Sequence, residues 1–468
     1  MTHPSRAPRF PTDLLDRVER VHLVGVGGSG MSSLATLLHD LGKVVTGSDL
    51  RDSAALRDLQ RRGVSVFVGH DASHLGQAEA VIVTSAARPD NPELVEARRR
   101  GLPVLRHADA LGLLSARKAT VAVAGTHGKS TTTALTAYLL DRGGLDPTLI
   151  GGAEALNYGS ASRVGRGPHL VVEADEFDRR FLTLHPTVAI VTGIEPDHLD
   201  YYRDLDELTA AFAAFVERTA TDGLVVTCAD DARLATLPVA RRRETYGFSA
   251  SAGWRAEDVV VVPEGTTFTL VTPESPRRRV TMRLHGEHHV QNALAAIVVA
   301  RWAGVPLDAI VEALPGFRGT RRRLEWRGTA RGVTILDDYA HHPTAVRLTL
   351  EAARRGYPGR LRVVFQSHTT HRTARFLDEF AEALTVADEV VLVPIYRPVG
   401  REGEAADVTH EDLARRIRER PTRVASSLEE AERLLLEDLR PGDVVVTMGA
   451  GDVDRVGDRL LSRLRGAP

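Results

Sequence analysis

The chain has 468 residues with 60 basic and 62 acidic side chains, which gives a formal net charge of −2. This balance provides no electrostatic basis for binding nucleic acid, and the single cysteine, Cys228, excludes an intramolecular disulfide and a cysteine-cluster metal site. Because neither a signal-peptide pattern nor an apolar segment of the roughly 18 residues needed to cross a bilayer is present, we expect a cytoplasmic protein without membrane insertion.

Strand and helix patterns alternate over residues 20–108. The apolar run Val21–Gly25 ends in glycines, Met31–Leu41 has helical spacing, and Val44–Asp49 and Ala80–Thr84 are short β-rich runs. Such alternation predicts a parallel sheet with helices between its strands.

A glycine-rich motif joins the first of these strands to the first helix. The residues Gly25, Gly27 and Gly30 satisfy G-x-G-x-x-G, and Asp49 ends the next strand about 20 residues later, where a ribose-binding acid is expected. The glycines let backbone N–H groups approach a diphosphate at a helix N-terminus. A glycine turn without a ligand is the alternative, which the strand-to-helix context disfavours; the motif by itself favours NAD.

A second glycine loop follows the strand Thr120–Ala124 and precedes another helix. Its sequence from Gly125 to Thr132, GTHGKSTT, is a shortened phosphate loop. Backbone donors can surround phosphates, Lys129 can reach the outer phosphate oxygens, and the Ser130 hydroxyl can bind Mg²⁺. The chain has only three lysines, and one of them stands at the position that this chemistry requires.

Carboxylates and a histidine follow the next two predicted strands. The sequence Glu173-Ala-Asp175-Glu176-Phe-Asp178 comes after a strand that begins at Leu170, and strand alternation predicts that Glu173 and Asp175 share one face. We favour Glu173 as a metal ligand, whereas Asp178 is as easily a polar strand exit. His198 follows the strand Val188–Thr192, which favours a metal or phosphate role over a purely structural one.

The remaining patterns extend to the C-terminus. Residues 249–285 read as a β-rich insertion, and the polar pair His288 and Asn292 precedes a helix predicted over 293–301, where such residues usually act as caps. A third series of strands begins near Val333. Histidine-bearing loops follow its first two strands, at the edge where open parallel sheets bind ligands, which suits an anionic substrate.

Several of these stretches together resemble the Mur ligases, the ATP-dependent amide-bond-forming enzymes of peptidoglycan synthesis. The resemblance extends from residue 21 to residue 452 in the order of the family. It is carried by the stretches VGVGGSGMSSLA, AVAGTHGKSTTT, VEADEFD, TGIEPDHLDYY, GEHHVQNALAA, GTRRRLEW, DDYAHHPT, FQSHTTHRT and MGAGD.

The resemblance implies an α/β fold of three domains. A Rossmann-like N-terminal domain (1–110) would bind a UDP-sugar, not NAD. A central P-loop ATPase-like domain with the β-rich insertion (111–316) would bind ATP, and a Rossmann-like C-terminal domain (317–468) would bind the amino acid.

Site residues are carried over from the same resemblance. The UDP-sugar would contact Gly25, Gly27, Gly28, Ser29, Gly30, Asp49, Thr84, Ser85 and Ala86. ATP would contact Gly125, Thr126, His127, Gly128, Lys129, Ser130, Thr131, His288, Asn292, Arg322, Arg323 and Asp338. Mg²⁺ would be held by Ser130, Glu173 and His198, with Lys129, Glu173 and His198 as the catalytic residues, and the amino acid by His341, His342, His368 and Arg372.

Within the family, the motifs are most similar to the branch that joins L-alanine to UDP-N-acetylmuramate through an acyl phosphate, with His198 as the base. Residues 199–222 contain no lysine, so the carbamylated lysine of some later-acting relatives is absent. Departures from the family pattern at Phe177, Gly193, His289 and Ser367 leave a ligase that attaches a recycled peptide to UDP-N-acetylmuramate as an alternative.

Two readings from other functional classes also remain. One is an NAD-dependent dehydrogenase built on the first glycine loop, and the other is an inactive nucleotide-binding regulator. The phosphate loop argues against the first, and the presence of Lys129, Glu173, His198 and Arg372 argues against the second. We expect a monomer or a homodimer.

Overall fold

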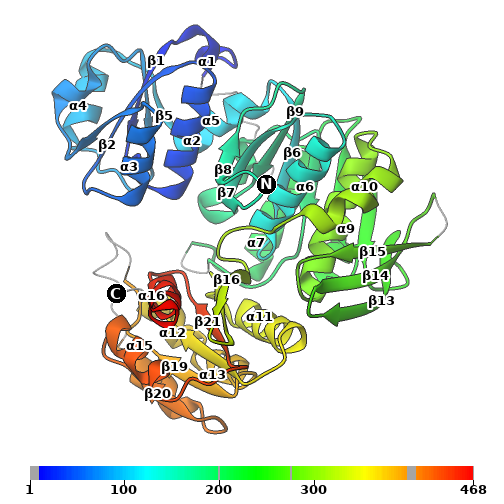
Figure 1. Cartoon of the computed structure of the whole chain (residues 1–468). Coiled ribbons are helices and arrows are strands. Elements are labelled where there is room, and N and C mark those ends of the chain that lie inside the picture. The colour runs from blue at the N-terminus through cyan, green and yellow to red at the C-terminus, as the bar shows by residue number, and fades with distance from the viewer. Residues whose placement is uncertain (1–9, 199–200, 275–276, 398–406, 467–468) are drawn as a thin grey trace. The chain divides into compact units, whose positions relative to one another are not determined.

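The structure is a computed structural model that describes residues 10–198, 201–274, 277–397 and 407–466 (Figure 1). It divides into two compact units. The first comprises Met1–Ala256, Leu270–Arg277 and Gln291–Ala313, and the second comprises Glu257–Thr269, Arg278–Val290 and Leu314–Pro468. Three sheets of mostly parallel strands confirm the predicted α/β class. The predicted domain borders at residues 110 and 316 stay a prediction.

The N-terminal sheet has five parallel strands in the order β3-β2-β1-β4-β5. Its strands are β1 (Arg20–Val24), β2 (Val44–Asp49), β3 (Ser65–Val68), β4 (Ala80–Val83) and β5 (Val104–Arg106). The helices are α1 (Leu14–Arg17), α2 (Ser29–Asp40), α3 (Ala54–Arg61), α4 (Pro92–Arg99) and α5 (His107–Ser115). The strand order reverses between β1 and β4, so a ligand crevice is expected where these two strands end.

The middle sheet has ten strands in the order β15-β14-β13-β12-β11-β10-β6-β9-β7-β8. They are β6 (Ala119–Ala124), β7 (Thr148–Ala155), β8 (Ser160–Arg163), β9 (His169–Glu173), β10 (Val188–Val191), β11 (Leu224–Cys228), β12 (Arg242–Gly247), β13 (Trp254–Val262), β14 (Gly265–Val271) and β15 (Arg278–Met282). The last three strands confirm the β-rich insertion. Because β6, β9 and β10 are adjacent and parallel, the loops that follow them meet at one edge.

Helices accompany the middle sheet. They are α6 (Lys129–Arg142), α7 (Leu205–Glu217), α8 (Ala232–Thr236), α9 (Glu287–Trp302) and α10 (Leu307–Ala313), with a 3₁₀ segment, η2, at Phe177–Thr183. The start of α9 differs from the prediction. The helix begins at Glu287, so His288 and Asn292 lie inside its first turns, one helical turn apart, and do not precede it as caps.

The C-terminal sheet has the order β16-β17-β21-β18-β19-β20, in which β16 is antiparallel and the other strands are parallel. Its strands are β16 (Glu325–Ala330), β17 (Val333–Asp338), β18 (Leu361–Phe365), β19 (Glu389–Leu392), β20 (Thr422–Val424) and β21 (Val444–Met448). Its helices are α11 (Pro343–Gly356), α12 (Thr370–Arg375), α13 (Leu377–Leu384), α14 (His410–Arg416), α15 (Leu428–Leu436) and α16 (Asp454–Arg465).

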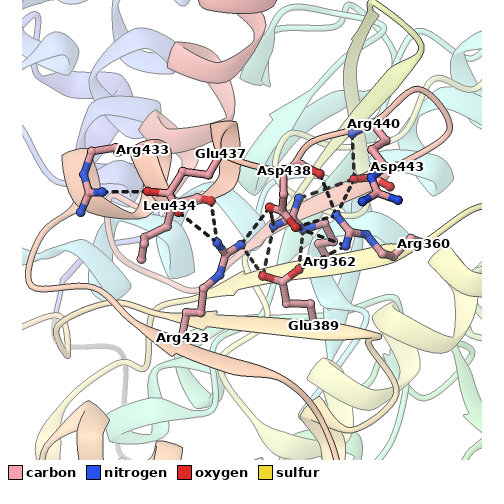
Figure 2. A network of polar contacts seen from close by, with 10 residues as sticks. All are labelled: Arg360, Arg362, Glu389, Arg423, Arg433, Leu434, Glu437, Asp438, Arg440 and Asp443. Atoms are coloured by element: carbon pink, nitrogen blue, oxygen red, sulfur yellow. Dashed lines mark hydrogen bonds and ion pairs between the residues drawn. The ribbon is translucent and has the colours of Figure 1, made fainter.

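A network of ion pairs occupies the edge at which the C-terminal strands begin (Figure 2). Arg362, on β18, is completely buried and donates to Glu389 on β19 at 3.0 Å and to Asp438 at 2.8 Å. Arg423, on β20, pairs with the same two carboxylates. Each of these charges therefore has an opposite partner, and this edge of the sheet has a structural role. A ligand is expected at the opposite edge, where the strands end.

The strands of each sheet carry mostly buried apolar side chains. Strands β4 and β10 are buried along their whole length, which accounts for the continuous apolar runs that marked them in the sequence. Over the part of the chain that the structure describes, every helix is too short or too polar to span a bilayer.

Candidate active site

The first glycine loop connects β1 to α2 and is held in place by two side chains from neighbouring strands. Gly25 has φ +79°, and a side chain there would collide with Thr84 after β4. The Gly27 N–H donates to the Asp49 carboxylate at the end of β2, at 2.9 Å. Gly28 caps α2 without a side-chain acceptor, so the helix N-terminus has no competing cap of its own.

The other residues expected at the UDP-sugar surround this loop. The Gly30 carbonyl lies 3.2 Å from His107 Nε2, and burial lowers the pKa of that imidazole. Ser85, in the Thr84–Ala86 segment, accepts a hydrogen bond from Arg180 of η2 at 2.8 Å. The structure thus brings Gly25, Gly27, Asp49 and Thr84 together; Ser29 lies in the first turn of α2.

The second glycine loop connects β6 to α6. Gly125 has φ +126° and Gly128 has φ +81°, and a side chain at either position would collide with Thr192 or Asn292, respectively. Gly128 caps α6 without a side-chain acceptor, which leaves the first turn of α6 ready for phosphate oxygens.

Loop contacts place further expected residues beside the phosphate loop. The Thr126 hydroxyl accepts from the Glu195 N–H at 2.9 Å, and the Thr132 hydroxyl, in α6, lies 3.2 Å from Asn292 Oδ1. Residues 125–131 and Asn292 are therefore neighbours, although 160 positions separate Thr132 from Asn292. Sequence reasoning did not identify Thr192, whose hydroxyl donates to the His127 carbonyl and fixes the loop.

The Lys129 ammonium group has three acceptors. Its Nζ lies 2.6 Å from the Gly125 carbonyl, 2.8 Å from Glu176 Oε1 and 3.4 Å from the Thr126 carbonyl. The Lys129 side chain is 16% exposed and that of Glu176 is 1% exposed. Burial lowers the pKa of Lys129, but the Glu176 carboxylate outweighs this effect and holds that pKa above its usual value.

The acidic cluster does not lie along a strand as the alternation argument assumed. Strand β9 ends at Glu173, which accepts the Gly152 N–H at 2.8 Å, and Asp175 lies beyond the strand, where it pairs with Arg180 at 3.1 Å. The shared-face prediction is therefore wrong for Asp175. Glu176 is the carboxylate that reaches Lys129, and the sequence analysis did not single it out.

His198 lies on the loop after β10 in a left-handed conformation with φ +53°. Its N–H donates to the Asp197 carboxylate at 2.8 Å, and its ring centroid is 5.0 Å from that of Phe177. Non-glycine residues in this conformation are uncommon and concentrate at functional sites, which is consistent with a ligand role for the loop.

The residues expected to hold Mg²⁺ have a mixed chemical fit. Ser130 in α6 and Glu173 at the end of β9 offer the oxygen atoms that Mg²⁺ prefers, and they follow adjacent parallel strands. The imidazole of His198 offers nitrogen, which suits Mg²⁺ less well and suits a proton acceptor better.

The two arginines expected at ATP differ in their surroundings within the second unit. Arg322 pairs with Asp337 at 3.0 Å and donates to the carbonyls of Gly449 and Gly451, both at 2.7 Å. Those contacts commit its guanidinium to the junction of β17 and β21. Both guanidinium groups lie over the Tyr339 ring, at 5.1 Å for Arg322 and 5.4 Å for Arg323. Because the ion pair and the two carbonyls hold Arg322, Arg323 is the better candidate for a phosphate contact.

Asp338, expected at ATP, is buried. Its two oxygens accept the N–H groups of Leu324 at 2.6 Å and Ala340 at 2.7 Å. Burial raises its pKa, and Arg323 offsets part of this effect. His288 is partly buried, and desolvation lowers its pKa to about 4, so its imidazole is neutral at physiological pH and can accept a hydrogen bond.

Two of the four residues expected at the amino acid form an aromatic cluster. The His341 and His368 rings lie 5.7 Å apart, and His368 lies 5.8 Å from Tyr396 with nearly parallel rings. His342 caps α11 and packs against Phe376 instead. Arg372 lies in α12, where its N–H donates to Thr369. The sequence analysis did not name Tyr396, because tertiary pairing brings it beside this loop: its N–H donates to the Ser367 carbonyl at 2.9 Å, and its carbonyl accepts the Thr369 N–H at 3.0 Å.

Comparisons with known proteins identify the relatives of this chain. Three family models match consecutive parts of the chain: the Mur ligase family catalytic domain over residues 20–119, the Mur ligase middle domain over 123–300, and the Mur ligase glutamate ligase domain over 322–451.

Individual proteins are similar over almost the whole chain. The UDP-N-acetylmuramate–L-alanine ligase of Geobacter sp. (strain M21) is 42% identical over 94% of this chain and 96% of its own length. The namesake enzyme of Thermobifida fusca is 42% identical over 93% of this chain and 94% of its own. The crystal structure of UDP-N-acetylmuramate–alanine ligase from Thermotoga maritima matches with a TM-score of 0.81 at 29% identity, covering 96% of this chain and 99% of that one.

Proposed function

The chain belongs to the Mur ligase family, and from that premise we propose that it is an ATP-dependent ligase that joins L-alanine to the lactyl carboxylate of UDP-N-acetylmuramate. The product would be a precursor of peptidoglycan. The dehydrogenase and regulator readings do not fit this family, whose members form amide bonds with ATP.

The observation that carries the proposal is the pairing of two glycine loops in one compact unit. One loop, with Asp49 on its Gly27 N–H, has the geometry for a diphosphate without any lysine. The other has Lys129 at the start of α6 and carboxylates at the end of the adjacent strand β9. A sugar nucleotide in the first and ATP in the second account for both loops, whereas a dehydrogenase needs only the first.

Each residue has a role in this reaction that follows from its position. The N-terminus of α6 and Lys129 neutralise the charge that develops on the transferred phosphoryl group when the lactyl carboxylate attacks it. Mg²⁺, bound by Ser130 and Glu173, would supply further charge neutralisation. This attack releases ADP and leaves an acyl phosphate. The amine of L-alanine then attacks the acyl carbon, and phosphate leaves as the amide forms; His198, on the loop after β10, would accept the ammonium proton.

In the second unit, His341, His368 and Arg372 would bind the amino acid, with Arg372 pairing with its carboxylate. Arg323 would contact ATP. We also propose that Mg²⁺ is the resident metal and that the enzyme works in the cytoplasm as a monomer or homodimer, since ATP and UDP-sugars are cytoplasmic substrates.

The test is phosphate release by the whole chain with ATP, Mg²⁺ and UDP-N-acetylmuramate, scored against a panel of acceptors. We expect L-alanine to give the highest kcat/KM, above glycine, L-serine and a tripeptide. Phosphate release that ignores every acceptor, or that requires no UDP-sugar, would refute the proposal.

One observation favours a second candidate. A murein peptide ligase from Psychrobacter arcticus matches with a TM-score of 0.72 at 26% identity, and Phe177, which departs from the alanine-ligase pattern, packs against His198. A clear preference for the tripeptide over L-alanine in the same panel would establish that candidate.

A further inference from the structure

The ion pair between Lys129 and Glu176 raises a question about ATP binding. An ammonium group has three N–H donors, and Lys129 already has three acceptors: two loop carbonyls and Glu176 Oε1. Phosphate oxygens can bind Lys129 only if at least one of these acceptors leaves. The carbonyls of Gly125 and Thr126 are part of the phosphate loop itself, so the Glu176 carboxylate is the acceptor that a ligand competes with directly.

The backbone fixes Glu176 in this place. The Tyr202 hydroxyl and the Arg179 N–H both donate to the Glu176 carbonyl, at 2.5 Å and 3.0 Å. Asp178 and Arg179 follow in left-handed conformations with φ +55° and +54°. Each such residue costs on the order of 1 kcal/mol or more, so this turn persists because the contacts around it hold it.

The carboxylate itself is incompletely satisfied. Glu176 Oε1 binds Lys129, whereas Oε2 is buried and has no hydrogen-bond partner among the residues that the structure describes. A buried carboxylate with a single charged partner is costly to separate from it. The Glu176 carboxylate therefore separates from Lys129 more readily when another cation or a proton takes the place of the lysine.

We propose that Glu176 is a positioning residue that holds the Lys129 ammonium group while no nucleotide is bound, and that the phosphates of ATP displace it from Lys129. This inference rests on the proposed function, because it assigns Lys129 to ATP. It predicts that Glu176 weakens ATP binding: its negative charge competes with the phosphates for one lysine. In return, the lysine stays ordered at the loop and nucleotides leave more readily after the reaction.

The direct test is calorimetric titration of the whole chain with Mg²⁺ and β,γ-methylene-ATP, which binds without turnover. We expect Glu176→Gln, which keeps the shape and removes the charge, to tighten binding by about threefold to tenfold. Glu176→Asp keeps the charge and should leave the Kd within about twofold of wild type. The comparison variant is Asp175→Asn, which removes the neighbouring carboxylate that pairs with Arg180 and acts on Lys129 through its charge; it should tighten binding by a smaller factor than Glu176→Gln does.

Unchanged or weaker binding in Glu176→Gln would overturn the proposal. Equal tightening in Glu176→Asp and Glu176→Gln would also overturn it, because the effect would then come from packing and not from charge. In turnover, a merely structural role lowers kcat and leaves the KM for ATP in place, whereas the proposed role lowers the KM for ATP in Glu176→Gln more than it changes kcat.

A measurement on the wild-type chain keeps the proposal testable if the variants do not fold. Separation from Lys129 leaves a buried carboxylate that should capture a proton. Asp175 and the Tyr202 phenol, the other titratable groups beside it, cannot replace the lost positive charge. Titrations with the ATP analogue at pH 8 in buffers of different ionisation enthalpy should show net proton uptake, and no uptake would count against the displacement.

The same experiments distinguish a failure of this inference from a failure of the proposed function. A chain that binds the analogue more tightly as Glu176→Gln but forms no amide with any acceptor would keep this inference and refute the ligase. A wild-type ligase whose nucleotide affinity is insensitive to Glu176 would do the reverse.

Discussion

Two buried glutamates, one near each glycine loop, have pKa values that are shifted in opposite directions. Glu93, on α4 behind the first loop, is fully buried and accepts from Ser48 at 2.7 Å, with His70 Nδ1 and His74 Nδ1 at 2.9 Å and 3.0 Å. Burial raises its pKa, but the bonds from His22, Ser48 and His74 outweigh burial and lower that pKa to about 2. Glu176 is also buried, and there burial dominates and raises its pKa to about 7, because the ion pair with Lys129 offsets only part of this effect and the nearby Asp175 carboxylate adds to it.

The number of hydrogen-bond donors, and not burial, therefore distinguishes a carboxylate that stays charged in its place from one that can give up its partner. Several hydrogen-bond donors contact the Glu93 carboxylate and stabilise its charged form. One of them, Ser48, is the residue before Asp49, which accepts from the first glycine loop. Among the residues that the structure describes, the Glu176 carboxylate pairs with Lys129, which the proposed reaction needs at the phosphates of ATP.

Removal of the shared lysine should have the largest effect. Lys129→Ala deletes both the phosphate contact and the cation that pairs with Glu176, so we expect ADP formation to fall by about 10³-fold or more. Binding of UDP-N-acetylmuramate, measured by calorimetry, should survive, because the first glycine loop contains no lysine. Near-normal turnover in this variant would contradict the role of Lys129.

Glycine geometry at the second loop should have the next largest effect. Gly128, before α6, and Gly144, after it, have nearly the same conformation, with φ +81° and +82°. A side chain at Gly128 meets Asn292, whereas one at Gly144 meets nothing within 4 Å. We expect Gly128→Ala to lower kcat/KM for ATP by about 10²-fold.

The matched variant Gly144→Ala carries the same backbone strain without the collision. It should lose a few degrees of Tm and little activity. Equal losses of activity in Gly128→Ala and Gly144→Ala would show that strain, and not the contact with Asn292, governs the loop.

A smaller and more selective effect is expected at the first loop. Asp49→Ala removes the acceptor of the Gly27 N–H and the expected ribose contact, so the KM for UDP-N-acetylmuramate should rise about tenfold. The KM for ATP should stay within about twofold. Steady-state kinetics with each substrate varied in turn would check this, and equal changes in both constants would contradict the assignment of one nucleotide to each loop.

The smallest effect on activity should come from Glu93. Glu93→Gln leaves buried imidazole and hydroxyl donors with a weaker acceptor, so we expect a loss of about 1–3 kcal/mol in the free energy of unfolding. KM for ATP should not change. Thermal unfolding followed by circular dichroism measures the loss in stability.

The pH dependence of that loss has a definite sign. The pKa of Glu93 is lower in the folded state than its usual value of 4.5, so its stabilising contribution is complete above about pH 4.5 and disappears as the pH falls toward 2. The difference in Tm between wild type and Glu93→Gln should therefore shrink over that window. A difference that grows on acidification would show that Glu93 is not held as a carboxylate.

Local patterns were enough to predict much of the fold. The apolar runs at β1, β6, β10 and β18 announce buried parallel strands because both of their faces are covered, and the glycines that follow β1 and β6 mark loops in which the backbone must turn left-handed or approach closely. Short, partly exposed strands such as β3 and β20 were missed, because they lack a continuous apolar run.

The chemical groups of the candidate site are recognisable from the sequence: two glycine loops, one lysine at the second loop, and carboxylates and histidines at strand ends. Only the tertiary structure decided which of these groups meet. It placed Glu176, 47 residues from Lys129, on the ammonium group and committed Arg322 to Asp337 and two carbonyls. The physical reason is that pairing and desolvation depend on groups brought together from distant parts of the chain, which no local pattern encodes.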